Sequence, residues 1–157
     1  MSEWMHSLLG WLALPEVGLS TVFVVALLSA TLLPMGSEPA VFALVSLNPD
    51  LFWPTIVVAT VGNTLGGMLG WWMGLGAHRL LDRVRGTGED SHHARALRWL
   101  EKLGPKACLL SWLPGVGDPL CVVAGWLRMP ALTCLMYMAV GKFLRYVVMT
   151  SVLMWVF

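Results

Sequence analysis

Two short interruptions of apolar sequence limit how this chain can fold. Residues 34–39 and 114–119 share the form Pro-x-x-x-acid-Pro, and apolar sequence flanks both. The interruptions are made by four prolines: Pro34, Pro39, Pro114 and Pro119. Two prolines and a carboxylate so close together cannot continue a helix. In lipid, broken backbone is tolerated only where it is buried in protein or lines a cavity. The interruptions therefore predict hairpins that turn inside the protein.

The composition is that of an integral membrane protein. Of the 157 residues, 57% are hydrophobic and 12% are charged, whereas soluble domains carry about 25% charged residues. A spanning helix needs about 20 apolar residues, so there is room for only a few spans. The net charge of +1 does not indicate nucleic-acid binding. Three cysteines in apolar sequence, Cys108, Cys121 and Cys134, predict buried free thiols without a metal or cofactor.

Weak internal similarity divides the chain into two halves. Val61-Gly62-Asn63 follows the first interruption, and Val140-Gly141-Lys142 follows the second at nearly the same distance along the sequence. Repeats with interrupted apolar segments are typical of transporter folds. We therefore predict related halves over residues 16–77 and 104–157, with chance similarity as the alternative.

The basic residues predict the topology. No Lys or Arg precedes Arg79, and seven of the ten lie between Arg79 and Lys106. The positive-inside rule places this region, the predicted loop 78–103, in the cytoplasm. Residues 1–15 are too short to span and predict an interfacial helix.

The apolar segments predict an all-α membrane protein with a single domain over residues 1–157. Residues 54–76 and 130–156 are long enough to span, whereas residues 105–128 form two short arms around a break. Residues 17–47 form a similar hairpin, or a full span with a short return. The prediction is two inverted repeats, each a re-entrant helical hairpin plus a transmembrane helix.

Four glycines recur at every fourth position of the first span: Gly62, Gly66, Gly70 and Gly74. They share one helix face, which admits close approach of another backbone. Packing within the chain is one interpretation, and a homo-oligomer interface is the other.

Five polar residues are predicted to lie at similar depth: Glu38, Asn63, Asp118, Lys142 and Arg145. Buried charges need partners because an isolated charge is costly in lipid. We predict that Glu38 pairs with Lys142, with Asp118 as the next candidate. Arg145 either faces this site or extends toward the surface. Asp118 as a helix cap with Lys142 as its counter-ion is a purely structural alternative. The functional interpretation is a site that attracts an anion and binds a proton.

The chain resembles the DedA family of bacterial membrane proteins, and its small YqaA-like branch in particular. The resemblance rests on five stretches: Leu33 to Glu38, Gly62 to Gly67, Trp112 to Asp118, Val123 to Gly125, and Gly141 to Tyr146. It implies a multi-pass protein of the bacterial inner membrane with two inverted re-entrant hairpins. It also implies transport of a lipid, such as a polyprenyl-phosphate carrier, that depends on protons or other ions.

The chain departs from the family pattern at three positions. Ser111 and Gly117 stand where typical members carry arginines, and Gly67 stands where an acid is common. The arginines that the resemblance implies for phosphate binding are therefore absent at these positions. Lys142 and Arg145 are the candidate basic residues in their place.

Two other functional classes are considered beside transport. One is a non-transporting protein that organises the membrane or an assembly. The other is an intramembrane aspartyl protease, because Gly115-Val116-Gly117-Asp118 matches the Gly-x-Gly-Asp motif. Such an enzyme needs two carboxylates that share a proton. Its usual Tyr-Asp partner is absent from the sequence, so the prediction is a protein that is not an enzyme.

Overall fold

The computed structural model describes residues 15–32, 37–85, 101–113 and 117–156, and within these ranges it contains helices and turns but no strand. The elements in chain order are α2 (Pro15–Leu32), α3 (Glu38–Leu47), η1 (Pro49–Leu51), α4 (Phe52–Arg85), η2 (Gly104–Trp112), α6 (Gly117–Trp126) and α7 (Ala131–Val156). The predicted interfacial helix, apart from Pro15, and both Pro34 and Pro114 lie outside the described residues, as does most of the predicted loop.

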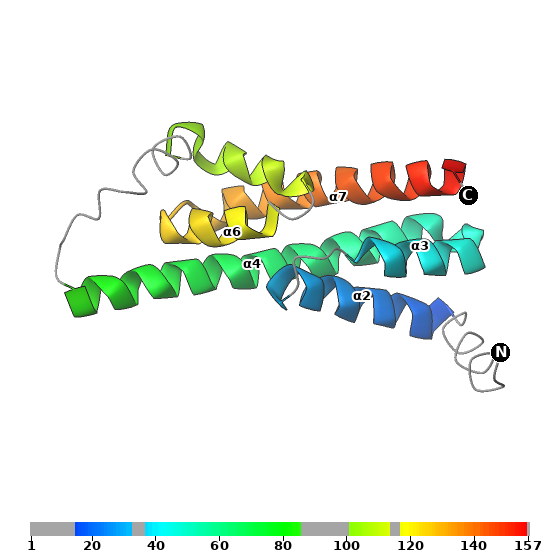
Figure 1. Ribbon diagram of the computed structural model, residues 1–157, viewed down its shortest axis with the longest axis horizontal. Helices are drawn as coiled ribbons and strands as arrows, with labels where there is room; N and C mark the ends of the chain where they lie inside the picture. Colours follow the sequence, from blue (N-terminus) through cyan, green and yellow to red (C-terminus); the bar gives the residue numbers. More distant parts are fainter. Residues whose placement is uncertain (1–14, 33–36, 86–100, 114–116, 157) are drawn as a thin grey trace.

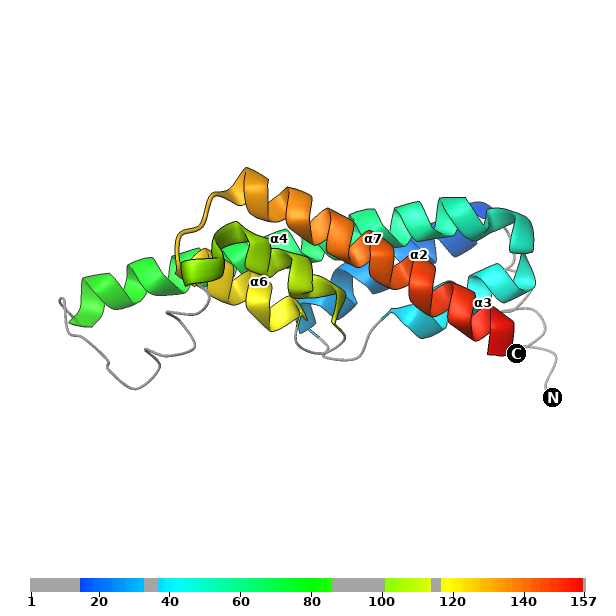
Figure 2. The same ribbon diagram turned by 90° about the horizontal axis from the view of Figure 1, so that it is seen from above.

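Two long helices, α4 and α7, run along the molecule in opposite directions (Figures 1 and 2). Among the described residues, these are the two helices long and apolar enough to cross a membrane, over Pro49–Leu80 and Ala131–Val156. The prediction of two such helices is confirmed. However, α4 continues to Arg85, past the predicted end at residue 76. The sequence after residue 76 loses its apolar character but keeps good helix formers, so the helix outlasts the hydrophobic segment.

The short elements pair at opposite ends of the long helices. Figure 1 shows α2 running from the right-hand end to the middle, with α3 returning to the right. At the other end, η2 runs from the left to the middle and α6 returns to the left. The arm predicted as a helix before residue 114 is a 3-10 helix of nine residues, an uncommonly long run for this type.

Both short return helices begin with an acid and a proline. In α3 the first residues are Glu38 and Pro39, and the Ser37 carbonyl oxygen accepts from the Ala40 and Val41 amides at 3.1 Å. In α6, Gly117 precedes Asp118 and Pro119. Proline is tolerated in the first helical turn because its missing N–H has no helical partner there. Asp118 and Glu38 are thereby held in the first turns of helices that start in the middle of the fold.

The glycine face of α4 is occupied by two neighbours in the same chain. A Cβ added at Gly62 or Gly66 would lie 2.7 or 2.6 Å from a carbonyl oxygen of α2. One added at Gly70 would lie 3.3 Å from Val122 of α6, and one added at Gly74 would overlap the Val122 carbonyl oxygen. The face therefore admits α2 at one end and α6 at the other.

Two apolar clusters fill the interior, one at each end. The first is built mainly from α2, α3 and the start of α4: Val22, Ala26, Val41, Leu44, Val45, Ile56, Ala59 and Tyr146. The second is built from η2, α6, the later part of α4 and the start of α7: Trp71, Cys108, Cys121, Ala124, Met129, Cys134 and Met138. The three cysteines are buried and free, as predicted. Asn63 of α4 and Lys142 and Arg145 of α7 lie between these clusters.

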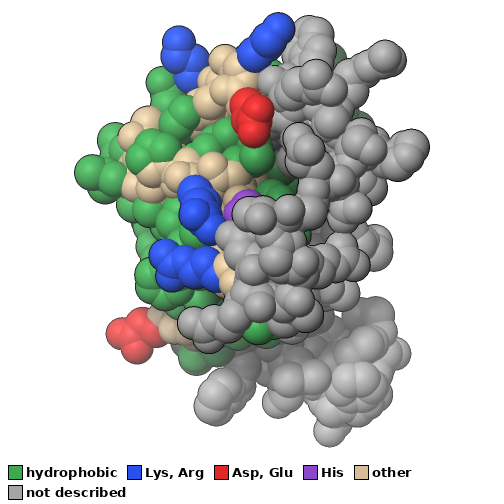
Figure 3. Space-filling view, turned by 90° about the vertical axis from the view of Figure 1, so that its left-hand side faces the viewer, with side chains coloured by type: hydrophobic (Ala, Val, Ile, Leu, Met, Phe, Trp, Pro, Cys, Tyr) green, Lys and Arg blue, Asp and Glu red, His purple; other side chains and the backbone are tan. Residues whose placement is uncertain are grey.

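The turn from α6 to α7 contains an unusual residue. The Arg128 amide donates to the Gly125 carbonyl oxygen and the Met129 amide donates to that of Ala124, both at 3.0 Å. This is a Schellman motif, whose left-handed position is usually glycine. Here the position is held by Arg128, with φ 53°. A Cβ in this conformation costs about 1–2 kcal/mol. The turn lies at the end of the molecule that faces the viewer in Figure 3.

The orientation in the membrane is testable by labelling. The positive-inside rule predicts that position 88 is cytoplasmic. A cysteine placed there, in a cysteine-free background, should stay unlabelled by an impermeant thiol reagent in intact cells and react after lysis. Labelling from outside intact cells would reverse the predicted topology.

Candidate functional site

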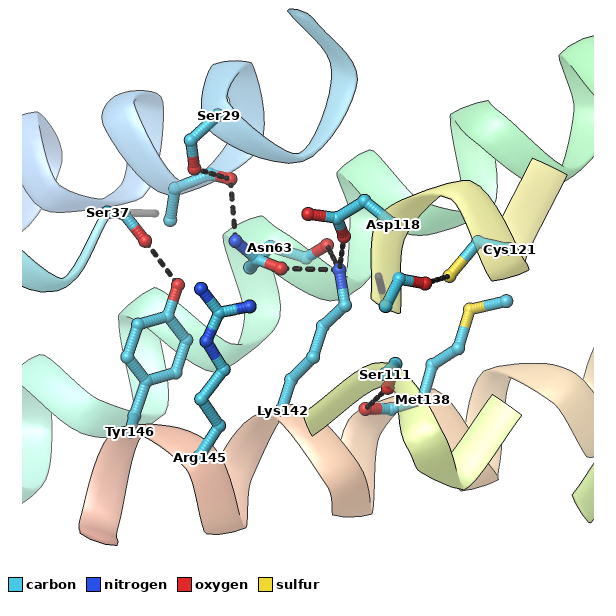
Figure 4. A network of polar contacts seen from close by, with 12 residues as sticks. Ser29, Ser37, Asn63, Ser111, Asp118, Cys121, Met138, Lys142, Arg145 and Tyr146 are labelled. Atoms are coloured by element: carbon cyan, nitrogen blue, oxygen red, sulfur yellow. Dashed lines mark hydrogen bonds and ion pairs between the residues drawn. The ribbon is translucent and has the colours of Figure 1, made fainter. Parts of the chain in front are cut away.

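Lys142 is the centre of a buried polar cluster. Its side chain is completely buried, and its ammonium donates to three oxygens. The acceptors are Asp118 Oδ1 at 2.8 Å, the Asn63 carbonyl oxygen at 2.7 Å, and Asn63 Oδ1. An ammonium has three donors, so each is used. Figure 4 shows the lysine reaching from α7 toward Asn63 on α4 and Asp118 on α6.

Asn63 extends this cluster to a fourth helix. Its amide Nδ2 donates to the Ala26 carbonyl oxygen of α2 at 3.2 Å, and Ser29 Oγ donates to the same oxygen at 3.1 Å. Gly67, one turn along α4, leaves room for the lysine, because a Cβ there would lie 3.1 Å from Lys142 Nζ. A single buried ammonium thus ties α7 directly to α4 and α6, and through Asn63 to α2.

Arg145 forms a second ion pair on the same side of α7. Its Nε and Nη2 both contact Glu38 Oε1 at the start of α3. The neighbouring residues are also bonded, since the hydroxyls of Ser37 and Tyr146 form a hydrogen bond. Arg145 is 4% exposed and Tyr146 is 1% exposed. Arg145 therefore faces the interior, and the alternative in which it extends to the surface is wrong.

The predicted pairing of Glu38 with Lys142 is wrong. The structure pairs Glu38 with Arg145 and pairs Lys142 with Asp118, which was the second candidate. Helix rise suggested that the five residues lie at similar depth, and the structure brings them together in two neighbouring ion pairs. Similar depth does not determine which residues pair. Lys142 and Arg145 are one turn apart, so one meets α6 while the other meets α3.

The two pairs sit near the middle of the two candidate membrane spans, Pro49–Leu80 and Ala131–Val156. Asn63 and Lys142 each come 11 residues after the first residue of their helix, Phe52 or Ala131. At 1.5 Å per residue this is about 17 Å, near the centre of a hydrocarbon core of about 30 Å. In this position the bases are hidden but the acids are partly accessible, with 17% of the Glu38 side chain and 23% of that of Asp118 exposed.

The sequence pattern of the VTT domain matches residues 33–154, which include all five polar site residues. The chain belongs to the VTT-domain (DedA) family. It is 35% identical over 136 residues to inner membrane protein YqaA of Escherichia coli, with 86% of this chain and 90% of the relative covered. The Shigella flexneri protein of the same name matches equally well. An uncharacterized protein of Haemophilus influenzae is 36% identical over 138 residues, with 80% of this chain and 81% of the relative covered.

Family membership settles the location and the broad class. This VTT-domain chain is a helical protein of the bacterial inner membrane. The relatives are named as membrane proteins, and no catalytic activity is indicated by their names. No solved structure matches the chain.

Two of the positions that depart from the family pattern, Ser111 and Gly117, are closely packed in the structure. Ser111 is completely buried against α7, and its Oγ donates to the Met138 carbonyl oxygen at 3.5 Å. A Cβ at Gly117 would lie 2.5 Å from the Ser111 carbonyl oxygen. The two positions at which the family resemblance predicts arginines are therefore tightly packed against each other here. The positive charge at this site comes from α7.

Sequence reasoning missed three contributors to the site. Ser37 and Tyr146 stand beside Glu38 and Arg145 and bond to each other, although neither was assigned a role. Gly67 was noted only as lacking an acid, whereas its missing side chain makes room for Lys142. The available signal in the sequence was that Ser37 directly precedes Glu38 and Tyr146 directly follows Arg145. Among the described residues, no group of three or more His, Cys, Asp or Glu side chains is arranged to hold a metal ion.

Proposed function

We propose that this VTT-domain protein is a membrane transporter that moves a lipid with an anionic headgroup, in exchange for or together with protons or other ions. The observation that carries the proposal is the pair of buried ion pairs near the middle of both candidate membrane spans. A polyprenyl-phosphate carrier, which the family resemblance implies, has the required chemistry.

The architecture supports this proposal. We infer that α2 with α3, and η2 with α6, are re-entrant hairpins that enter from opposite sides of the membrane as inverted repeats. The return helices α3 and α6 have 10 residues each, or about 15 Å, which is half a bilayer core. Their N-termini carry partial positive charge, which is suited to an anionic group.

The ion pairs provide a switch between bound proton and bound anion. While Glu38 and Asp118 are ionised, they neutralise Arg145 and Lys142. The acids are the more exposed partners, so an incoming proton reaches them first. Protonation of either acid would leave a buried base without its counter-charge, and an anionic headgroup would then be the favourable replacement.

A purely structural role explains the two pairs less well. A buried ion pair is weak evidence for stability, because apolar residues of similar volume often stabilise a protein as well or better. Ionisable residues inside a membrane are costly, and they commonly mark ion or substrate pathways. A chain with 12% charged residues that places four of them in this interior fits transport better.

The protease alternative lacks the required geometry. Two catalytic carboxylates must lie together and share one proton. Glu38 and Asp118 each bond to a different base on α7. This arrangement gives each carboxylate its own partner and gives no support to aspartyl chemistry.

Liposomes containing the purified protein test the proposal. We expect wild-type protein to move labelled anionic lipid, including polyprenyl phosphate, across the bilayer. Glu38→Gln and Asp118→Asn should lower the rate to that of protein-free liposomes, because neither variant can exchange a proton at its pair. Asp50→Asn is the matched control, since Asp50 is an exposed acid in η1, outside the site.

Two results would count against transport. If wild-type liposomes moved neither lipid nor ions faster than empty ones, the membrane-organising alternative would be favoured. If the two site variants retained the wild-type rate while remaining folded, the ion pairs would be structural.

A further inference from the structure

A basic surface lies at one end of the molecule, away from the buried ion pairs. It contains four exposed side chains, Arg79, Lys102, Lys106 and Arg128, and we name it the basic end patch. These residues come from α4, from the turn of helix at residues 101–103 and the start of η2, and from the α6–α7 turn, which meet at this end (Figure 1). Figure 3 shows lysine and arginine side chains spread over this end among hydrophobic ones. Among the side chains that the structure describes at this end, the acidic residue Glu101 is exposed beside Lys102.

The patch has a defined geometry. His78 stacks edge-on against Trp126, with ring centroids 5.1 Å apart. This contact holds the part of α4 around His78, and with it Arg79, beside the α6–α7 turn. Trp126 precedes Arg128 by two residues, so the same turn positions both the aromatic ring and the guanidinium.

The backbone at Arg128 gives independent evidence that its side chain matters. The left-handed position of a Schellman motif favours glycine, which has no Cβ. Arginine occupies it here at φ 53°, and its side chain is exposed. A strained backbone that persists in place of an easy alternative points to a function. The positive charge of Arg128 at this exposed point of the surface is the property that such a function would use.

The neighbouring side chains indicate what the charge binds. Leu80 follows Arg79 and is 63% exposed, and Leu103 follows Lys102 and is 43% exposed. Cations alternating with exposed leucines suit the boundary between lipid headgroups and acyl chains. A soluble anion would have no use for the leucines. The positive-inside rule assigns this end to the cytoplasmic side.

We propose that the basic end patch binds the phosphate headgroup of an anionic phospholipid in the cytoplasmic leaflet, and that Arg128 is kept in its left-handed position for this contact. This site is separate from the ion pairs and does not depend on the proposed transport function. Arg128 contacts the phosphate, and the exposed leucines contact the acyl chains.

The test separates the charge of Arg128 from its Cβ. Purified full-length protein in a neutral detergent is titrated with short-chain phosphatidylglycerol, and bound lipid is measured by native mass spectrometry. Phosphatidylcholine of the same chain length and inorganic phosphate are the comparison ligands. Arg128→Gly removes charge and Cβ, Arg128→Gln removes only the charge, and Arg128→Lys keeps both.

We expect the affinity for phosphatidylglycerol to depend on the charge at position 128. We expect the Tm to depend on whether the residue at that left-handed position has a Cβ. The glycine and glutamine variants should bind phosphatidylglycerol about fivefold more weakly than wild type, as expected for one basic residue at a membrane surface. The lysine variant should stay close to wild type. Without lipid, the Tm of Arg128→Gly should exceed that of wild type, while the glutamine and lysine variants should show no increase.

Several results would overturn the proposal. Equal affinity for phosphatidylcholine, or unchanged affinity in both uncharged variants, would show that Arg128 does not bind the headgroup. Displacement of the lipid by inorganic phosphate at the same concentration would indicate a site for a soluble anion. A lower Tm for Arg128→Gly would show that the arginine serves to stabilise the end of α6.

Discussion

Replacing Lys142 by methionine should lower the free energy of unfolding by about 3 kcal/mol, at the lower end of the range for breaking a buried ion pair. Methionine keeps most of the side-chain volume but leaves the Asp118 carboxylate and two Asn63 oxygens without their shared donor. The lower end is expected because 23% of the Asp118 side chain remains exposed. Reversible unfolding in mixed micelles measures the loss.

Double-mutant cycles identify the partner. Lys142→Met combined with Asp118→Asn should recover part of the loss, with a coupling energy above about 1 kcal/mol. Lys142→Met combined with Glu38→Gln should be closer to additive, because Glu38 bonds to Arg145. A matched cycle of Arg145→Met with Glu38→Gln should show coupling again. Strong coupling of Lys142 with Glu38 and none with Asp118 would contradict the observed pairing.

Replacing Gly125 by alanine should prevent α6 from packing on α4. A Cβ at Gly125 would overlap the Trp71 carbonyl oxygen, and one at Gly74 would overlap that of Val122. The two helices therefore meet at a reciprocal pair of glycines, where backbone lies against backbone. Overpacking against a side chain costs about 1–3 kcal/mol. Backbone cannot rotate away, so we expect a loss of at least about 3 kcal/mol and a sharp fall in folded yield.

Gly76 provides the control for this prediction. It lies on the same helix as Gly74, but a Cβ there would meet nothing within 4 Å. Gly76→Ala should therefore leave the yield unchanged and raise stability by up to about 1 kcal/mol, the usual gain from alanine in a helix. Yield is measured by size-exclusion chromatography of detergent extracts and stability by thermal unfolding. Normal yield for Gly125→Ala would show that α6 and α4 do not make this contact.

Much of the architecture was readable from the sequence. Low charge and long apolar segments predicted a helical membrane protein with spans near residues 54–76 and 130–156, and motifs around Gly62 and Gly141 indicated the family. Proline and acid together located the starts of α3 and α6, because proline is accepted in a first helical turn and hardly elsewhere. The two interruptions and the helix rise together also pointed to the five polar residues that the structure brings into contact.

The pattern of apolar residues did not predict where α4 ends or that η2 is a 3-10 helix. A helix leaves the apolar region without ending wherever its residues still favour helix, as α4 does on its way to Arg85. The 3-10 winding of η2 is found where it packs against α6 and α7, with Gly141 leaving room for the Leu109 carbonyl oxygen.

The pairing of charges was decided only by the tertiary structure. Sequence determines how far along a helix a residue lies, since each residue adds a fixed rise. It does not determine which neighbour occupies each side of that helix. Because α6 and α3 pack against successive turns of α7, Asp118 forms an ion pair with Lys142 and Glu38 forms one with Arg145. The absence of a side chain at Gly67 then allowed Lys142 to reach Asn63.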